Sequence, residues 1–147
     1  MKRERRRVRS LALQSLYEVD TVGHPAPEVL ARHIEMNPNL SDENIAFLRT
    51  IVLGVLDVSP QLDAWIADSA PEWPVDQLAV LDRNILRMAL WELAVSEETP
   101  LKVAINEAVE LAKRFGSDSS ARFINGVLGT LAKQESELRA LLQASPE

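Results

Sequence analysis

Cysteine is absent from this sequence of 147 residues, which excludes a disulfide framework and a thiolate metal site. The sequence also lacks an apolar run of about 20 residues, the length that a membrane-spanning helix needs. The basic N-terminus has no apolar segment behind it that is long enough for a signal peptide. These absences predict a protein that is neither exported by an obvious signal nor embedded in a membrane. We therefore expect it in the cytoplasm.

Catalytic and metal-binding patterns are equally scarce. The two histidines, His24 and His33, lie in the weakest predicted structure, and there is no H-E-x-x-H, Gly-rich turn or nucleophile elbow. Glu107 and Glu110 share one side of a predicted helix, as in di-metal carboxylate bundles. Such bundles also need Glu-x-x-His pairs on facing helices, and the sequence has none. We therefore expect no metal, no cofactor and no enzymatic activity.

The composition is that of one globular domain, 46% hydrophobic and 26% charged. The net charge of −6 argues against nucleic acid, but the charge is unevenly distributed. Residues 2–9 carry six basic side chains and one acidic side chain, a local charge of +5, so the other residues carry −11. A basic arm on an acidic body favours a steered contact with a polyanion. The alternative is a solvated tail that binds nothing.

Helical spacing of apolar residues recurs along the chain, and no segment alternates as a strand would. Apolar positions from Val8 to Val19 share one face, so the basic residues run directly into an amphipathic helix. Prolines, glycines and capping residues separate the helices that follow. The spacing predicts these further helices at about residues 28–36, 41–58, 59–69, 76–95, 99–115 and 118–133.

The clearest linker is the segment from Pro71 to Pro74, which divides the chain into halves. We therefore predict an all-α fold, a single domain of about seven helices in two small sub-bundles. The predicted parts are a basic arm at 1–9, sub-bundles at 10–70 and 75–133, and a tail at 134–147. The helix at 76–95 is apolar over more than half its circumference, which predicts a central position in its sub-bundle.

Three residues inside predicted helices are unusual. Glu92 lies within the apolar sweep of its helix, where an unpaired charge is expensive to bury. We expect it to accept hydrogen bonds from the backbone N–H groups that open the helix after Pro100. Gly126 and Gly129 each cost about 1 kcal/mol relative to alanine. Close helix packing is the preferred explanation for these glycines, and an approaching ligand is the alternative.

Tyr17 projects away from the apolar stripe of the first helix, beside Arg6 and Leu13. An exposed aromatic ring next to guanidinium groups is the arrangement that binds single-stranded RNA, because bases stack on the ring while arginines hold phosphates. Packing of the ring against the second sub-bundle explains the same position equally well.

Several blocks of residues stand out for their order and spacing. They are Arg5–Arg9, Ala12–Glu18, Leu53–Val55, Leu62–Asp63, Ile85–Leu93, Pro100–Lys113, Phe115–Gly116 and Arg122–Leu128. Across about residues 5–133 these blocks resemble the NusB family of transcription antitermination factors. Residues 20–40 and 134–147 add nothing to the resemblance, and Trp91 stands where the family has tyrosine.

The resemblance implies a fold of two helical sub-bundles and a function in transcription. The family binds the boxA element of nascent ribosomal RNA transcripts together with NusE, a small-subunit ribosomal protein. That complex joins the elongating RNA polymerase assembly and suppresses premature termination. The positions that would face RNA are Arg5, Arg6, Arg7, Arg9, Gln14, Tyr17 and Phe123. Asp76 and Asp82, with Arg83 nearby, would lie on the NusE side, where acidic residues suit a basic protein.

Two alternatives belong to other functional classes. Similar helical domains form the N-terminal part of ribosomal RNA cytosine methyltransferases, but those enzymes continue into a large Rossmann-like domain, and this chain ends at Glu147. The second alternative is a protein-only helical adaptor in which the arginines are incidental. A salt titration of RNA binding separates this adaptor from an antitermination factor. A homodimer is also open, because some family members pair through the RNA-facing surface.

Overall fold

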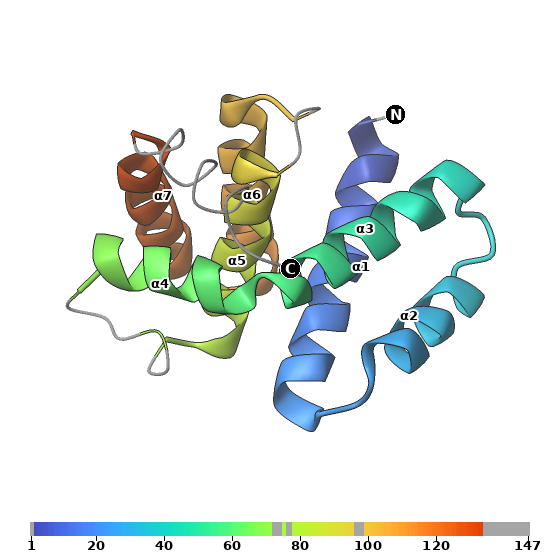
Figure 1. Cartoon of the computed structure of the whole chain (residues 1–147). Coiled ribbons are helices and arrows are strands. Elements are labelled where there is room, and N and C mark those ends of the chain that lie inside the picture. Colours follow the sequence, from blue (N-terminus) through green and yellow to red (C-terminus); the bar gives the residue numbers. More distant parts are fainter. Residues whose placement is uncertain (1, 72–74, 76–77, 96–98, 134–147) are drawn as a thin grey trace. The chain divides into compact units, whose positions relative to one another are not determined.

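A computed structural model describes residues 2–71, 75, 78–95 and 99–133 (Figure 1). These residues form seven α-helices and no strand, so the all-α prediction is confirmed. The helices are α1 (Lys2–Val22), α2 (Ala26–Glu35), α3 (Asp42–Asp57), α4 (Ser59–Ser69), α5 (Val80–Ala94), α6 (Leu101–Phe115) and α7 (Asp118–Ala132). No single helix in the described ranges is long and apolar enough to cross a membrane, and only α3 and α4 taken together reach that length and composition.

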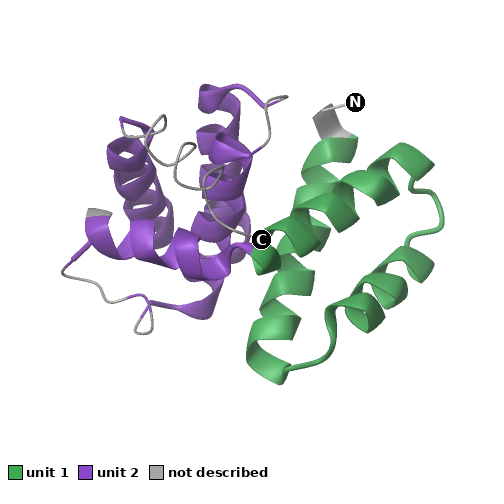
Figure 2. Ribbon diagram, viewed as in Figure 1, with its two compact units in different colours: residues 1–57 green, residues 58–147 purple. Residues whose placement is uncertain are grey.

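The chain divides into two compact units, residues 1–57 and 58–147 (Figure 2). The predicted boundary at 71–74 differs from this division, because α4 packs against α5 and α7. Leu62 and Ile66 of α4 are fully buried. Arg87 of α5 also donates two hydrogen bonds of 2.7 Å to the carboxylate of Asp63. These contacts assign α4 to the second unit.

In unit 1, α1 packs against both α2 and α3. Its helix begins at Lys2, so the basic residues described here form its first turns rather than a separate arm. The helix ends at Val22, and Gly23 follows it with a φ of 80°, the left-handed conformation that glycine adopts without strain. Ser41 caps α3, since its hydroxyl accepts a 3.1 Å hydrogen bond from the backbone N–H of Asn44.

In unit 2, α5 packs against α4, α6 and α7, and its residues from Ile85 to Ala94 are buried with the exception of Arg87. The predicted central helix is therefore confirmed, although it begins at Val80 rather than near residue 76. Glu92 is buried, and its carboxylate accepts a 3.0 Å hydrogen bond from the hydroxyl of Thr99. This bond ties the buried carboxylate of α5 to the residue that precedes Pro100 and α6.

The turn between α6 and α7 requires glycine at position 116. A Cβ atom there would lie 2.9 Å from the carbonyl oxygen of Ala112 and 2.9 Å from the hydroxyl of Ser120, closer than van der Waals contact allows. The glycines within α7 behave differently. A Cβ atom on Gly126 or Gly129 would meet nothing within 4 Å in the described structure, so close helix packing does not explain them.

Candidate nucleic-acid interface

The first turns of α1 hold all four predicted RNA-binding arginines, and these fall into two pairs. Arg5 and Arg9 are one turn apart on the side of α1 that packs against α3. The guanidinium carbon of Arg5 lies 3.9 Å from the ring centroid of Phe47, and that of Arg9 lies 5.5 Å from it. Arg9 is only 7% exposed, so it supplies positive potential more than direct contact.

The other pair, Arg6 and Arg7, is exposed. Arg7 Nη2 donates a 2.6 Å hydrogen bond to Asn37 Oδ1, and Asn37 Nδ2 donates in turn to the carbonyl oxygen of His33 at 2.7 Å. This chain of hydrogen bonds fixes the direction of the Arg7 side chain. A guanidinium has five N–H donors, so one such bond leaves most of them for other acceptors.

Gln14 and Tyr17 continue the exposed side of α1. Gln14 follows Arg7 by seven residues, and Tyr17 follows Gln14 by three, which places all three on one side of a helix. Gln14 is exposed, and its side-chain amide donates to the carbonyl oxygen of Ser10 at 3.2 Å. The Tyr17 side chain is 45% exposed, which leaves ring surface accessible from solvent. This exposure is compatible with the interpretation that an RNA base stacks on the Tyr17 ring.

Phe123 belongs to the second unit, in the second turn of α7. Phe123 is half-buried, and its neighbours Arg122 and Asn125 are exposed. The structure therefore gathers six of the seven predicted RNA-binding residues on α1 of unit 1 and places the seventh on α7 of unit 2.

The predicted partner-binding residues lie at the start of α5, except for Asp76, which is outside the described residues. Asp82 is half-buried; its Oδ2 accepts a 3.3 Å hydrogen bond from the Ser120 hydroxyl, and its buried Oδ1 has no partner within the described part of the chain. Burial raises the pKa of the Asp82 carboxyl, and the Ser120 hydrogen bond opposes that rise. Arg83 donates to the carbonyl oxygen of Val75 at 3.4 Å. Asp82 is thus tied to α7 as well as partly open to a partner.

Sequence reasoning missed the residues of α3 that contact Arg5 and Arg9. Phe47 contacts Arg5 and Arg9, and Glu43 Oε1 lies 3.2 Å from Arg5 Nη2. In the sequence Phe47 is indistinguishable from an ordinary apolar position of an amphipathic helix. Its stacking depends on how α3 packs against α1. The residues around Phe47 in the sequence do not indicate that packing.

A second polar cluster fastens the other end of α1 to α2. Arg32 donates to both carboxylate oxygens of Glu18, one of them at 2.9 Å, and His24 Nδ1 lies 2.7 Å from Glu18 Oε2. Hydrogen bonds from Arg32 and then His24 lower the pKa of Glu18 to about 2. This cluster serves the packing of unit 1.

The chain matches one protein-family model over most of its length. The family model for NusB matches residues 6–133, which begin in α1 and continue through α7. The chain belongs to the NusB family. A NusB relative from Roseiflexus sp. (strain RS-1), a transcription antitermination protein, is 50% identical over 137 residues, which cover 92% of this chain and 96% of the relative. The resemblance drawn from the sequence blocks is confirmed.

Solved NusB structures share this fold. The structure of NusB from T. maritima matches with a TM-score of 0.81 at 28% identity, covering 90% of this chain and 96% of that one. A crystal structure of the antitermination factors NusB and NusE in complex with double-stranded RNA matches with a TM-score of 0.82 at 23% identity, covering 90% of this chain and 98% of that one. At that identity the second match establishes the NusB fold alone.

Proposed function

We propose that this protein is a transcription antitermination factor that binds boxA-type single-stranded RNA of nascent ribosomal RNA transcripts together with NusE. The observation that carries the proposal is the exposed side of α1, where Arg6, Arg7 and Gln14 lie on the same helix as the accessible ring of Tyr17. Relatives of nearly the same length are transcription antitermination proteins, and a NusB of the same fold has been crystallised with NusE and RNA.

The chemistry of these side chains suits a single strand. Arginines neutralise phosphates and release counterions, which makes affinity depend on salt. An aromatic ring stacks on a base without selecting its identity, and an amide side chain such as that of Gln14 can both donate to and accept from a base edge. We assign phosphate contacts to Arg5, Arg6 and Arg7, base contacts to Gln14, Tyr17 and Phe123, and a purely electrostatic contribution to Arg9.

The NusE-binding side is assigned to the start of α5, around Asp82 and Arg83, with Asp76 as a further acidic member. A cation brought by a basic ribosomal protein favours the ionised form of Asp82, which burial disfavours. The assembly of RNA, NusE and this protein would then join the RNA polymerase elongation complex, which places the protein in the cytoplasm. Its task is binding, without an enzymatic step. A homodimer formed through the RNA-facing surface would compete with RNA.

The RNA part of this proposal can be tested by fluorescence anisotropy with a labelled boxA-like RNA, measured over a salt series. Replacing Arg6 and Arg7 together with glutamine should weaken binding and lower the slope of log affinity against log salt by about 0.7 per lost phosphate contact. Arg49→Gln removes an exposed arginine from α3 and is the matched control, which should leave the slope unchanged. Equal slopes for all three proteins would mean that Arg6 and Arg7 do not contact the phosphates.

The partner part is tested by adding purified NusE to the same titration and by size-exclusion chromatography of each mixture. NusE should raise RNA affinity, and linkage requires RNA to raise NusE affinity by the same factor. A protein-only adaptor would bind NusE without any effect of RNA. A dimer that blocks the RNA surface would dissociate when RNA is added.

A further inference from the structure

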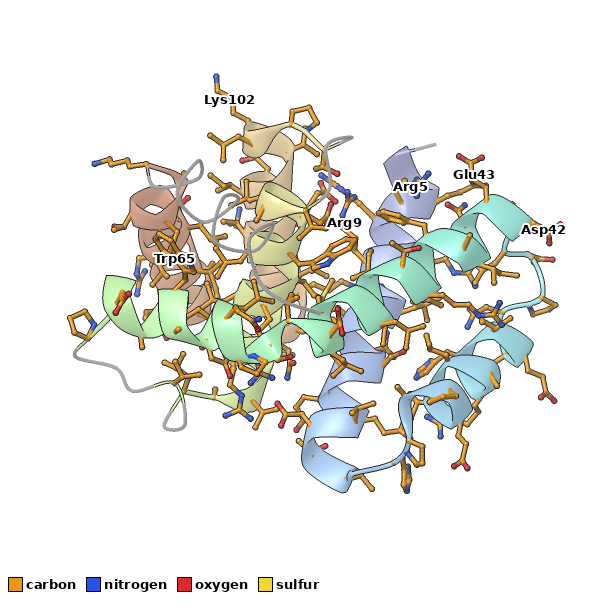
Figure 3. All side chains as sticks on the ribbon, viewed as in Figure 1. Arg5, Arg9, Asp42, Glu43, Trp65 and Lys102 are labelled. Atoms are coloured by element: carbon orange, nitrogen blue, oxygen red, sulfur yellow. The ribbon has the colours of Figure 1, made fainter. Side chains whose placement is uncertain are left out.

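The side of α1 that faces α3 holds two arginines against one aromatic ring. Arg5 and Arg9 are four residues apart, so they lie one above the other on the helix. Both guanidinium groups lie within cation–π distance of Phe47, at 3.9 Å and 5.5 Å from its centroid. Figure 3 shows both arginines on α1 beside α3. Two cations this close repel each other, and the negative face of the ring offsets part of that repulsion.

A guanidinium that stacks on a ring keeps its N–H donors available, whereas a hydrogen bond uses one of them. A guanidinium is flat, and its five N–H donors point outward in its own plane. A ring beneath that plane holds the orientation of the group without using a donor. The Arg5 side chain is 30% exposed, so donors held in this way can be reached from solvent.

Glu43 provides the second contact to Arg5, of a different kind. Its carboxylate lies 3.2 Å from Arg5 Nη2, and its side chain is 82% exposed. An ion pair so exposed is weak and screened by salt, and a phosphate group can replace the carboxylate. Glu4, the nearest acid on α1 itself, accepts a 3.1 Å hydrogen bond from Asn44 and is directed toward α3.

From this arrangement we propose that Phe47 is a positioning residue for RNA binding, which holds Arg5 and Arg9 in place, and that Glu43 occupies Arg5 until an RNA phosphate displaces it. The inference rests on the proposed function and adds to it two residues of α3 that do not themselves need to touch RNA. Arg9, which is buried, then contributes positive potential from the position in which Phe47 holds it, beside the partly exposed Arg5.

The test compares three variants of the full chain in anisotropy titrations with a boxA-like single-stranded RNA. Phe47→Leu keeps an apolar side chain against α1 but removes the ring, and should weaken affinity by about two- to fivefold and lower the salt slope. Phe47→Tyr keeps the ring and should bind as the wild type does. Glu43→Gln removes the competing carboxylate and should tighten binding, whereas Glu28→Gln, an exposed acid of α2, is the charge-matched control and should have less effect.

The outcomes separate the inference from the function on which it rests. If the wild type does not bind the RNA, the proposed function fails. If the wild type binds and both Phe47 variants weaken binding equally, Phe47 acts only through packing and the inference is wrong. Wild-type affinity and slope in Phe47→Leu would also overturn it. If Phe47→Leu does not fold, as judged by circular dichroism, Glu43→Gln decides, and affinity equal to that of Glu28→Gln contradicts the proposal.

Discussion

Both units of this molecule have an apolar core and polar contacts between helices, but the two units use their arginines differently. In unit 1, polar side chains join the helices at several points. These contacts are Arg5 to Glu43, Glu4 to Asn44, Arg7 to Asn37 and Arg32 to Glu18. In unit 2, the buried apolar run of α5 is shared by α4, α6 and α7. Unit 1 therefore uses the same arginines for its own packing and, as we propose, for RNA, whereas the central helix of unit 2 is packed mainly through buried apolar side chains.

The largest effect should come from the core of unit 2. Leu86 is fully buried on α5, so Leu86→Ala removes apolar contacts and leaves a cavity, which costs about 2–5 kcal/mol of unfolding free energy. Because the loss is apolar, it should be nearly the same at low and high salt. Urea unfolding at two ionic strengths measures it. A loss that shrinks strongly with salt would mean that unit 2 is not an apolar core of the kind described.

The next effect concerns RNA binding by α1. Tyr17→Ala should weaken binding of a single-stranded RNA by about 1–3 kcal/mol if a base stacks on the ring, without unfolding the domain. Phe123→Ala on α7 should do the same. Anisotropy and thermal melting are measured on each variant. If the melting temperature of Tyr17→Ala falls sharply while the folded fraction binds normally, the ring serves packing and its assignment to RNA is wrong.

A smaller effect is expected at the start of α5. Asp82→Lys places a positive charge against a basic partner and should weaken NusE binding by about tenfold, while RNA binding by the isolated chain stays the same or rises slightly. The variant also breaks the hydrogen bond from Ser120. Ser120→Ala is therefore the control, because it breaks that hydrogen bond and keeps the charge. Calorimetry measures the affinity of each variant for NusE. If Asp82→Lys binds NusE as tightly as the wild type does, the interface lies on another helix.

The smallest effect is a dependence of stability on pH, and its sign differs between the units. The folded pKa of Glu18 in unit 1 is lowered from 4.5 to about 2, so its stabilising contribution is present above pH 4.5 and is lost as the pH falls toward 2. The pKa of Asp82 in unit 2 is raised, so its ionisation opposes folding as the pH rises. Glu18→Gln should lower stability at pH 7 but not at pH 2, and Asp82→Asn should not show this pattern. Thermal melts across this range measure both.

Local periodicity predicted the helices well, because each amphipathic stripe and each capping serine or proline lies within a few residues of the element it defines. The division into units was not predictable in this way. Pro71–Pro74 is the strongest break in the sequence, but Leu62, Ile66 and Asp63 bind α4 to unit 2 through contacts with residues far along the chain. Only the packed structure identifies those contacts.

For the candidate site, the sequence predicted a charged surface on the first helix but not how burial divides its arginines. A run of arginines predicts a charged surface, and Arg6 and Arg7 are indeed exposed, whereas Arg9 is buried. The difference arises because the helical repeat turns Arg5 and Arg9 toward α3, where Phe47 accommodates them. Gly126 and Gly129 illustrate the opposite case, since their positions suggested a close neighbour and the described structure has none.

The arginines of α1 have one more consequence, for the motion of the helix that carries them. The positive end of a helix dipole lies at its N-terminus, and adjacent cations there destabilise the first turns. Glu4 is the one acidic residue that offsets Arg5 and Arg6 in this part of α1. The amide hydrogens at the start of α1 should therefore exchange with solvent sooner than those near Leu11 and Leu16, and a bound polyanion should slow that exchange by neutralising the charges that drive the opening.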